Sequence, residues 1–104
     1  YKKIFSSQLE NLAEKGDLLF VFSCSGNSKN IKEAIVFAKK KKLKIVQVLG
    51  FKKKSKISYN EKILALNCYN YGIAEDIFQS VMHMVSQRLR VQYIKTLNFN
   101  KLKI

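Results

Sequence analysis

The sequence predicts an α/β fold in which helices cover a parallel β-sheet. Residues 18–22, which read LLFVF, form a short and unbroken apolar run, the pattern of a strand buried on both faces of a parallel sheet. A helical pattern follows this run, and a second strand pattern follows the helix. A strand, a crossover helix and a strand in succession form a right-handed βαβ unit with parallel strands.

Helical spacing marks both the segment before the first strand and the segment between the two strands. Residues 3–15 are expected to form a helix that ends at Gly16, because glycine readily adopts the positive φ found just past a helix C-terminus. The next helix ends in four lysines at residues 39–42, which suit the negative end of the helix dipole. The apolar stripes of the two helices are Ile4, Phe5, Leu9, Leu12 and Ala13, and Ile31, Ala34, Ile35 and Ala38.

The second half of the chain supplies further strands and a long helix. Residues 44–49 alternate towards the second strand, which Gly50 closes, and the lysine-rich residues 51–61 are expected to form an exposed loop or a short helical turn. Residues 63–68 are predicted to form a third strand, and a helix is predicted from residue 73 to about residue 94. The buried stripe expected on that helix comprises Ile73, Ile77, Val81, Val85 and Leu89, widened by Phe78 and Met84.

Residues 23–28, which read SCSGNS, join the first strand to its helix and form the candidate site. They offer the hydroxyls of Ser23, Ser25 and Ser28, while Gly26 permits a positive φ and Asn27 can shape the turn. Backbone N–H groups of such a loop, and of the first turn of the next helix, can converge on a phosphate. In open α/β sheets ligands bind beyond the carboxyl ends of the strands, where this loop falls. The alternative is an ordinary capped turn.

The SCSGNS string, after a strand that opens with Gly-Asp, closely resembles the S-[TC]-S-G-N-S phosphosugar loop of the sugar isomerase (SIS) domain family. The similarity continues through NIKEAIVFAKKKKLKIVQVLG and YGIAEDIFQSVMHMVSQRL, and it covers about residues 1–95. Within the family the chain is most similar to the phosphoheptose isomerases, which act on sedoheptulose 7-phosphate in the synthesis of surface-polysaccharide heptose. The resemblance implies a three-layer α/β/α sandwich of the flavodoxin-like type, cytoplasmic location, a phosphorylated sugar as ligand and a homotetramer.

The resemblance also assigns roles to residues. It implies that Ser23, Ser25, Gly26, Asn27 and Ser28 bind the substrate phosphate. It further implies that His83, the only histidine, serves as an acid or base in the aldose–ketose proton transfers. A histidine packed on a helix face is the alternative. In the family the histidine is partnered by a glutamate from an earlier portion that is not found in this sequence.

We therefore expect residues 1–95 to be the C-terminal part of a single SIS domain, followed by a tail at 96–104, and to be inactive by themselves. A non-catalytic SIS domain is the alternative, acting as a phosphosugar sensor or as a scaffold that binds a replication initiator.

Two departures from the family concern the predicted last helix. Glu75 stands where the family usually has glutamine, a residue that in some members helps the histidine to hold zinc. The pair lies eight residues apart, about 12 Å along a helix axis, so metal is the minority interpretation and no cofactor is required. Phe78 occupies a second histidine position of the family, and AED replaces the common IQE. These changes concern the identity of the sugar rather than the phosphosugar loop.

Composition sets limits on other functions. The formal charge of +13 supports non-specific binding to phosphates, but no nucleic-acid-binding signature accompanies it, so we favour solvated lysine faces over a nucleic-acid partner. No apolar run approaches the roughly 20 residues that cross a bilayer. Cys24 and Cys68 suit a reducing compartment, and Cys24 is interpreted as a small residue that fills its position, with a reactive thiol as the alternative.

Overall fold

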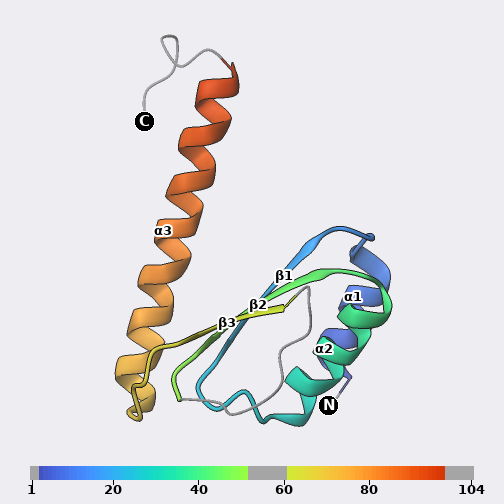
Figure 1. Ribbon diagram of the computed structural model, residues 1–104, viewed down its shortest axis with the longest axis vertical. Helices are drawn as coiled ribbons and strands as arrows, with labels where there is room; N and C mark the ends of the chain where they lie inside the picture. The colour runs from blue at the N-terminus through green and yellow to red at the C-terminus, as the bar shows by residue number, and fades with distance from the viewer. Residues whose placement is uncertain (1–2, 52–60, 98–104) are drawn as a thin grey trace.

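The computed structural model describes residues 3–51 and 61–97 of the 104-residue chain. In chain order the elements are α1 (Ile4–Leu12), β1 (Leu18–Ser23), α2 (Lys29–Lys40), β2 (Lys44–Leu49), β3 (Glu61–Ala65) and α3 (Tyr71–Leu97). Figure 1 shows the three strands side by side, with α1 and α2 on the right of the view and the long helix α3 on the left.

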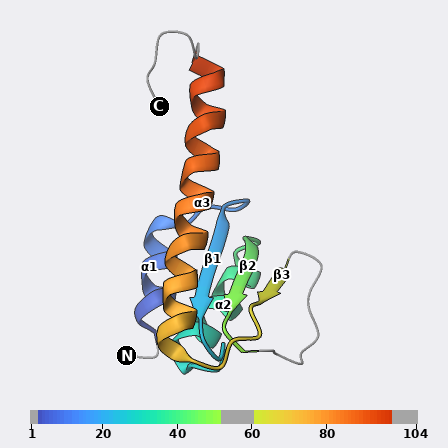
Figure 2. The same ribbon diagram turned by 90° about the vertical axis from the view of Figure 1, so that its left-hand side faces the viewer.

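The strands form one parallel sheet in the order β1-β2-β3. Leu18 of β1 lies opposite Lys44 of β2, and Ile45 of β2 lies opposite Glu61 of β3. The predicted βαβ unit with parallel strands is therefore confirmed. Because every strand points the same way, the three carboxyl ends meet at one edge of the sheet. Figure 2 shows the strand arrowheads at the same end of the molecule as the first turns of α2 and α3.

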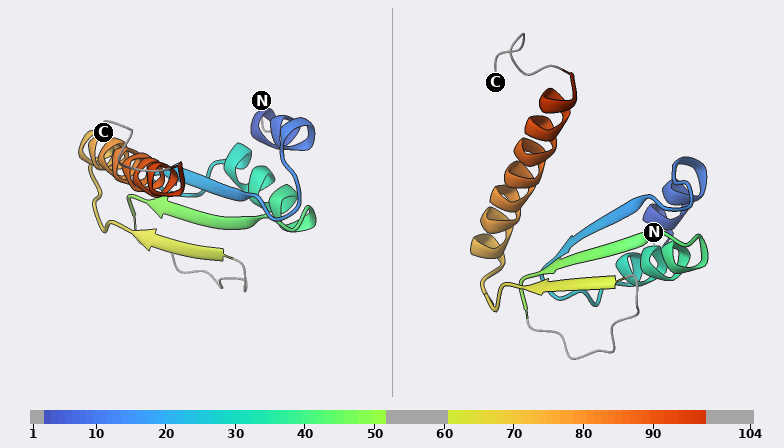
Figure 3. Two further views of the ribbon diagram at one scale, coloured as in Figure 1. Left: turned by 90° about the horizontal axis from the view of Figure 1, so that it is seen from above. Right: turned by 45° about the horizontal axis from the view of Figure 1, so that its top comes forward.

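Two apolar clusters lie on opposite faces of the sheet and make the fold three-layered. On one face Val21 and Ile45 pack against Ile35 and Ala38 of α2, and α1 completes this layer. On the other face Phe22 and Val48 pack against the first turns of α3. Figure 3 shows α3 on one side of the sheet and α2 on the other. The expected α/β/α sandwich is confirmed.

The stripe predicted on the last helix is only partly buried. Ala74 and Phe78 are buried against the sheet and Val81 packs beside them. Ile73, Met84 and Leu89 are instead 54%, 64% and 61% exposed, respectively. Ile73 is exposed because it lies about 100° around the helix from the sheet-facing Ala74. Met84 and Leu89 lie further along α3, which has 27 residues and runs well beyond the sheet (Figure 1).

Several predicted boundaries need correction. The first helix ends at Leu12, and Gly16, with φ at +90°, belongs to a later turn in which Asp17 accepts a hydrogen bond from the N–H of Glu14. The third strand spans Glu61–Ala65 rather than 63–68, because Asn67 adopts a left-handed φ of +57° and turns the chain out of the sheet.

The expected lysine-rich loop and the expected tail lie partly outside the described residues. Helix α3 begins two residues earlier than predicted and continues across the boundary that we placed after residue 95. The lysine-rich loop at 51–61 lies outside the described residues except for its two ends, and so does the tail from residue 98.

Candidate functional site

The serine loop, residues 23–28, leaves the carboxyl end of β1 and enters α2. The Ser23 hydroxyl oxygen accepts a hydrogen bond from the N–H of Gly26 at 2.9 Å, and the Ser25 hydroxyl oxygen accepts one from the N–H of Asn27 at 3.2 Å. Gly26 has a φ of +70°, which a residue with a side chain rarely adopts. Because both hydroxyls act as acceptors within the loop, their protons remain available for a ligand oxygen.

The first turn of α2 adds further donors beside these hydroxyls. Ser28 occupies the N-cap position, yet its side chain makes no capping hydrogen bond. Within the described part of the chain, the N–H groups of Lys29 and Asn30 also have no acceptor. A helix N-terminus with unpaired N–H groups attracts anions. The loop and this turn together can therefore bind an anion such as a phosphate monoester.

Hydrogen bonds between neighbouring strand ends hold the serine loop in place. The Gly50 N–H donates to the Ser23 carbonyl at 3.2 Å, and the Phe51 N–H donates to the Cys24 carbonyl at 2.7 Å. The Cys68 N–H donates in turn to the Gly50 carbonyl at 2.7 Å. The carboxyl ends of all three strands are thus tied together, and these backbone hydrogen bonds anchor the start of the loop.

Gly50 has a second role at this edge, because α3 begins directly against it. A Cβ atom on Gly50 would lie 3.1 Å from the Ala74 Cβ and 3.3 Å from both the Cα and the carbonyl oxygen of Cys24. The absence of a side chain therefore lets α3 approach the serine loop. Asn70 starts this helix, since its side-chain oxygen accepts a hydrogen bond from the N–H of Ile73 at 3.1 Å.

Sequence comparison finds that part of the chain is similar to one class of enzyme. The chain is 48% identical over 50 residues to the phosphoheptose isomerase of Glaesserella parasuis and, over the same length, 48% identical to that of Cytophaga hutchinsonii. Each alignment covers 48% of this chain and 26% of the relative. The chain is similar to part of a phosphoheptose isomerase. It matches no protein-family model.

Solved structures of phosphoheptose isomerases share the fold. The enzyme from Neisseria gonorrhoeae superposes with a TM-score of 0.73 at 22% identity, over 80% of this chain and 48% of that chain. The enzyme from Francisella tularensis gives the same TM-score and identity, over 80% of this chain and 45% of that chain. The chain thus spans about a quarter of the curated phosphoheptose isomerases that it matches and about half of these solved chains.

Cys24 lies buried inside the serine loop. Burial raises the pKa of its thiol, and the negative charge of Glu75 and the neighbouring Cys68 raise it further. The thiol is therefore held in its protonated and poorly nucleophilic form, in agreement with a filling role. The effect of Glu75 also places its carboxylate within electrostatic reach of the loop, on the first turns of α3.

The structure does not bring His83 to the serine loop of its own chain. Its side chain is exposed, and it lies nine residues beyond Ala74, which is about 13 Å along the helix axis. Nine residues also make two and a half turns, so His83 projects from the side of α3 opposite to Ala74, which faces the sheet. Within one chain, Glu75 is near the loop and His83 points away from it.

The described residues do not make a zinc site. A zinc ion needs three or four protein ligands, and no group of three or more His, Cys, Asp or Glu side chains in the described ranges could hold a metal ion. Glu75 and His83 are the two side chains that the resemblance suggests for this role. Their separation along α3 leaves them unable to bind one ion without ligands from elsewhere.

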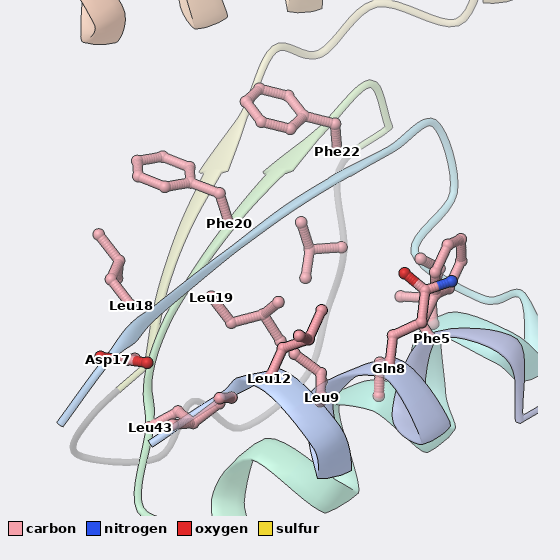
Figure 4. A pocket seen from close by; sticks show the side chains of 14 residues that line it. Phe5, Gln8, Leu9, Leu12, Asp17, Leu18, Leu19, Phe20, Phe22 and Leu43 are labelled. Carbon is pink, nitrogen blue, oxygen red and sulfur yellow. The ribbon is translucent and has the colours of Figure 1, made fainter. Parts of the chain in front are cut away.

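An apolar pocket of about 560 Å³ lies apart from the candidate site. It runs between α1 and β1, where Leu9 and Leu12 face Leu19 (Figure 4). No residue of the serine loop lines it. Asp17 and Gln8 are its few polar members, so the pocket offers little to a phosphosugar. In the described sheet it follows the edge of β1 that has no neighbouring strand.

Among residues 3–51 and 61–97, no helix combines the length and the apolar character that a bilayer-spanning segment requires.

Proposed function

We propose that this chain is part of a sugar-phosphate isomerase of the phosphoheptose isomerase type, and that the serine loop holds the phosphate of its substrate. The observation that carries the proposal is the geometry of the serine loop. Ser23, Ser25 and Ser28 surround Gly26, which has a positive φ, at the carboxyl edge of the sheet, and the N-terminus of α2 that follows has no side-chain cap. The identity of 48% to curated phosphoheptose isomerases favours this chemistry over a sensor or a scaffold.

The proposed reaction converts a ketose phosphate, sedoheptulose 7-phosphate, into an aldose phosphate. One group removes a proton from C1 while the C2 carbonyl oxygen gains a proton, which gives an enediol. A proton is then delivered to C2, and the O1 hydroxyl loses its proton as the C1 aldehyde forms. Because every proton removed is returned, the reaction needs no oxidant and no cofactor.

We assign His83 to one of these proton transfers, since an imidazole can accept and donate a proton near neutral pH. The second group in this proposal is a glutamate from a part of the protein other than residues 1–104. The position of His83 adds a condition: because it projects away from its own serine loop, it must serve the loop of another subunit. We therefore propose a homotetramer with sites at subunit boundaries, working in the cytoplasm.

Subunit mixing tests both the isomerase and the shared site. The full-length protein is prepared as His83→Ala, which keeps its serine loop, and as Ser25→Glu, which keeps its histidine but sets a negative charge against the phosphate. Each variant alone should lose ketose–aldose conversion, by about 10²- to 10⁴-fold for His83→Ala. Mixed subunits should regain part of it, because some boundaries then pair an intact loop with an intact histidine.

The outcomes of the mixing experiment separate the alternatives. No conversion by the unmodified protein would refute the isomerase and favour the sensor or scaffold. If each variant alone loses conversion and the mixture does not regain it, His83 and the serine loop of the same subunit act in one site. Undiminished kcat in His83→Ala would remove His83 from the mechanism.

A further inference from the structure

Three aromatic side chains gather at the carboxyl edge of the sheet, and we call them the aromatic cluster: Phe51, Tyr69 and Tyr71. Phe51 follows the end of β2, Tyr69 lies in the connection from β3 to α3, and Tyr71 is the first residue of α3. The Phe51 and Tyr69 rings stack, with their centroids 5.1 Å apart and their planes at 19°. The Tyr71 ring meets the Phe51 ring edge-on, with the centroids 5.3 Å apart and the planes at 78°.

Backbone hydrogen bonds place the aromatic cluster next to the serine loop. The Phe51 N–H donates to the carbonyl of Cys24 within that loop at 2.7 Å. On the other side of β2, the Cys68 N–H donates to the Gly50 carbonyl at 2.7 Å, and Tyr69 follows directly. The first turn of α3 lies at the same end of the sheet (Figure 2). Because one hydrogen bond joins Phe51 to the serine loop, a ligand held there through its phosphate can reach the aromatic cluster with its remaining atoms.

The two tyrosines of the aromatic cluster are exposed, although their rings are held in place. Tyr69 is 65% exposed and Tyr71 is 60% exposed. One face of the Tyr69 ring covers Phe51, and its hydroxyl donates a hydrogen bond to the side-chain oxygen of Asn67 at 3.3 Å. Rings that are already ordered lose little conformational entropy when a ligand binds. The aromatic cluster therefore offers an open and preorganised surface beside the anion site.

The angle between the rings favours a puckered ligand over a flat one. Because Phe51 is nearly parallel to Tyr69 and nearly perpendicular to Tyr71, the two exposed tyrosine rings are steeply inclined to each other. A flat nucleobase can stack on one of these rings but not on both. A sugar presents C–H groups on a puckered carbon skeleton, and the negative face of an aromatic ring attracts such groups.

We infer that the aromatic cluster contacts the carbon skeleton of the phosphosugar whose phosphate the serine loop holds. Tyr69 and Tyr71 are then specificity residues, which make the site prefer a sugar phosphate to a bare phosphate. The inference rests on the proposed function, because it takes the serine loop as the phosphate site. It gives the tyrosines no part in proton transfer. Recognition of the phosphate and recognition of the carbon skeleton therefore belong to different residues and can be measured separately.

The test is calorimetric titration of the full-length protein with two ligands, sedoheptulose 7-phosphate and inorganic phosphate. Tyr69→Ala and Tyr71→Ala should each weaken binding of the sugar phosphate by about three- to tenfold and leave binding of inorganic phosphate unchanged. Tyr69→Phe keeps the ring and should bind both ligands as the unmodified protein does. Tyr93→Ala is the matched control, because Tyr93 is 64% exposed in the far half of α3. All these positions are exposed, so the variants should keep the native circular dichroism spectrum.

Ser25→Glu separates this inference from the proposed function. It should weaken binding of both ligands, because it sets a negative charge against the phosphate. If it does so while Tyr69→Ala and Tyr71→Ala bind the sugar phosphate as tightly as Tyr93→Ala, the inference alone is wrong. Equal loss of both ligands in the tyrosine variants also overturns it, since the rings would then only support the loop. Adenosine 5′-monophosphate that binds as tightly as the sugar phosphate would overturn it in favour of a nucleobase. If Ser25→Glu changes the affinity for neither ligand, the serine loop is not the phosphate site, and the inference fails with the proposed function.

Discussion

At the scale of single residues, the candidate site depends on backbone geometry as much as on its serines. The motif residues 23–28 could be identified from sequence because hydroxyls and a glycine follow a buried strand. The part played by Gly50 could not, since its importance arises from α3, which begins over twenty residues later and packs on it. Likewise, the sequence puts His83 eight residues from Glu75, but only the packing of Ala74 and Phe78 fixes the side of the helix that faces the sheet.

Gly50→Ala is expected to displace the serine loop, because the space beside Gly50 is filled by Ala74 and Cys24. The added methyl group would press on Ala74 and on the backbone of Cys24 at 3.1 to 3.3 Å. Overpacking of this kind costs about 1 to 3 kcal/mol of stability, and the displaced loop should also bind phosphosugar less tightly. Chemical denaturation and calorimetric titration measure the two effects.

Gly72→Ala is the control, because Gly72 lies in α3 and its new Cβ would meet only the Asn70 side chain, at 3.5 Å. That substitution should be neutral or should stabilise by up to about 1 kcal/mol. If both alanine variants behave alike, Gly50 has no special role at the carboxyl edge.

At the scale of elements, strands and helices were predictable wherever a short pattern is decisive and the neighbours are close in sequence. The strand–loop–helix–strand order of β1, α2 and β2 is of this kind. The end of β3 was not predictable, because apolar residues continue to Leu66 while the left-handed Asn67 turns the chain away. The burial of α3 was misjudged for a related reason: periodicity identifies an apolar stripe but does not say how much of it a sheet of this size can cover.

The start of α3 is held by Asn70, which satisfies the N–H of Ile73. Asn70→Ala should therefore lower the free energy of unfolding by about 0.5 to 2 kcal/mol. Since this turn adjoins Gly50, the variant should also loosen the contact between α3 and the serine loop. Gln87→Ala, an exposed substitution in the same helix, serves as the comparison and should change stability by under about 0.5 kcal/mol. Equal melting temperatures for Asn70→Ala and the unmodified chain would show that the cap contributes nothing.

At the scale of the whole molecule, the described residues form three layers but leave three features uncovered. They are the edge of β1, the apolar pocket between α1 and β1, and exposed apolar side chains of α3 such as Met84 and Leu89. The fold class was predictable because a βαβ unit with a buried strand allows few alternatives. The burial of α3 was not, since only the packing of Ala74 and Phe78 shows which side of this helix faces the sheet.

The central claim is that the serine loop binds the phosphate of a phosphosugar, and calorimetric titration of the chain with sedoheptulose 7-phosphate tests it most directly. Ser25→Ala should weaken binding by about 1 to 3 kcal/mol through loss of a hydrogen bond to a charged group, and Ser25→Glu should weaken it further. Ser80→Ala, which removes an exposed hydroxyl on α3, should have no effect, and sedoheptulose without its phosphate should not bind. Unchanged affinity in both Ser25 variants, or equal binding of the sugar without phosphate, would contradict the account.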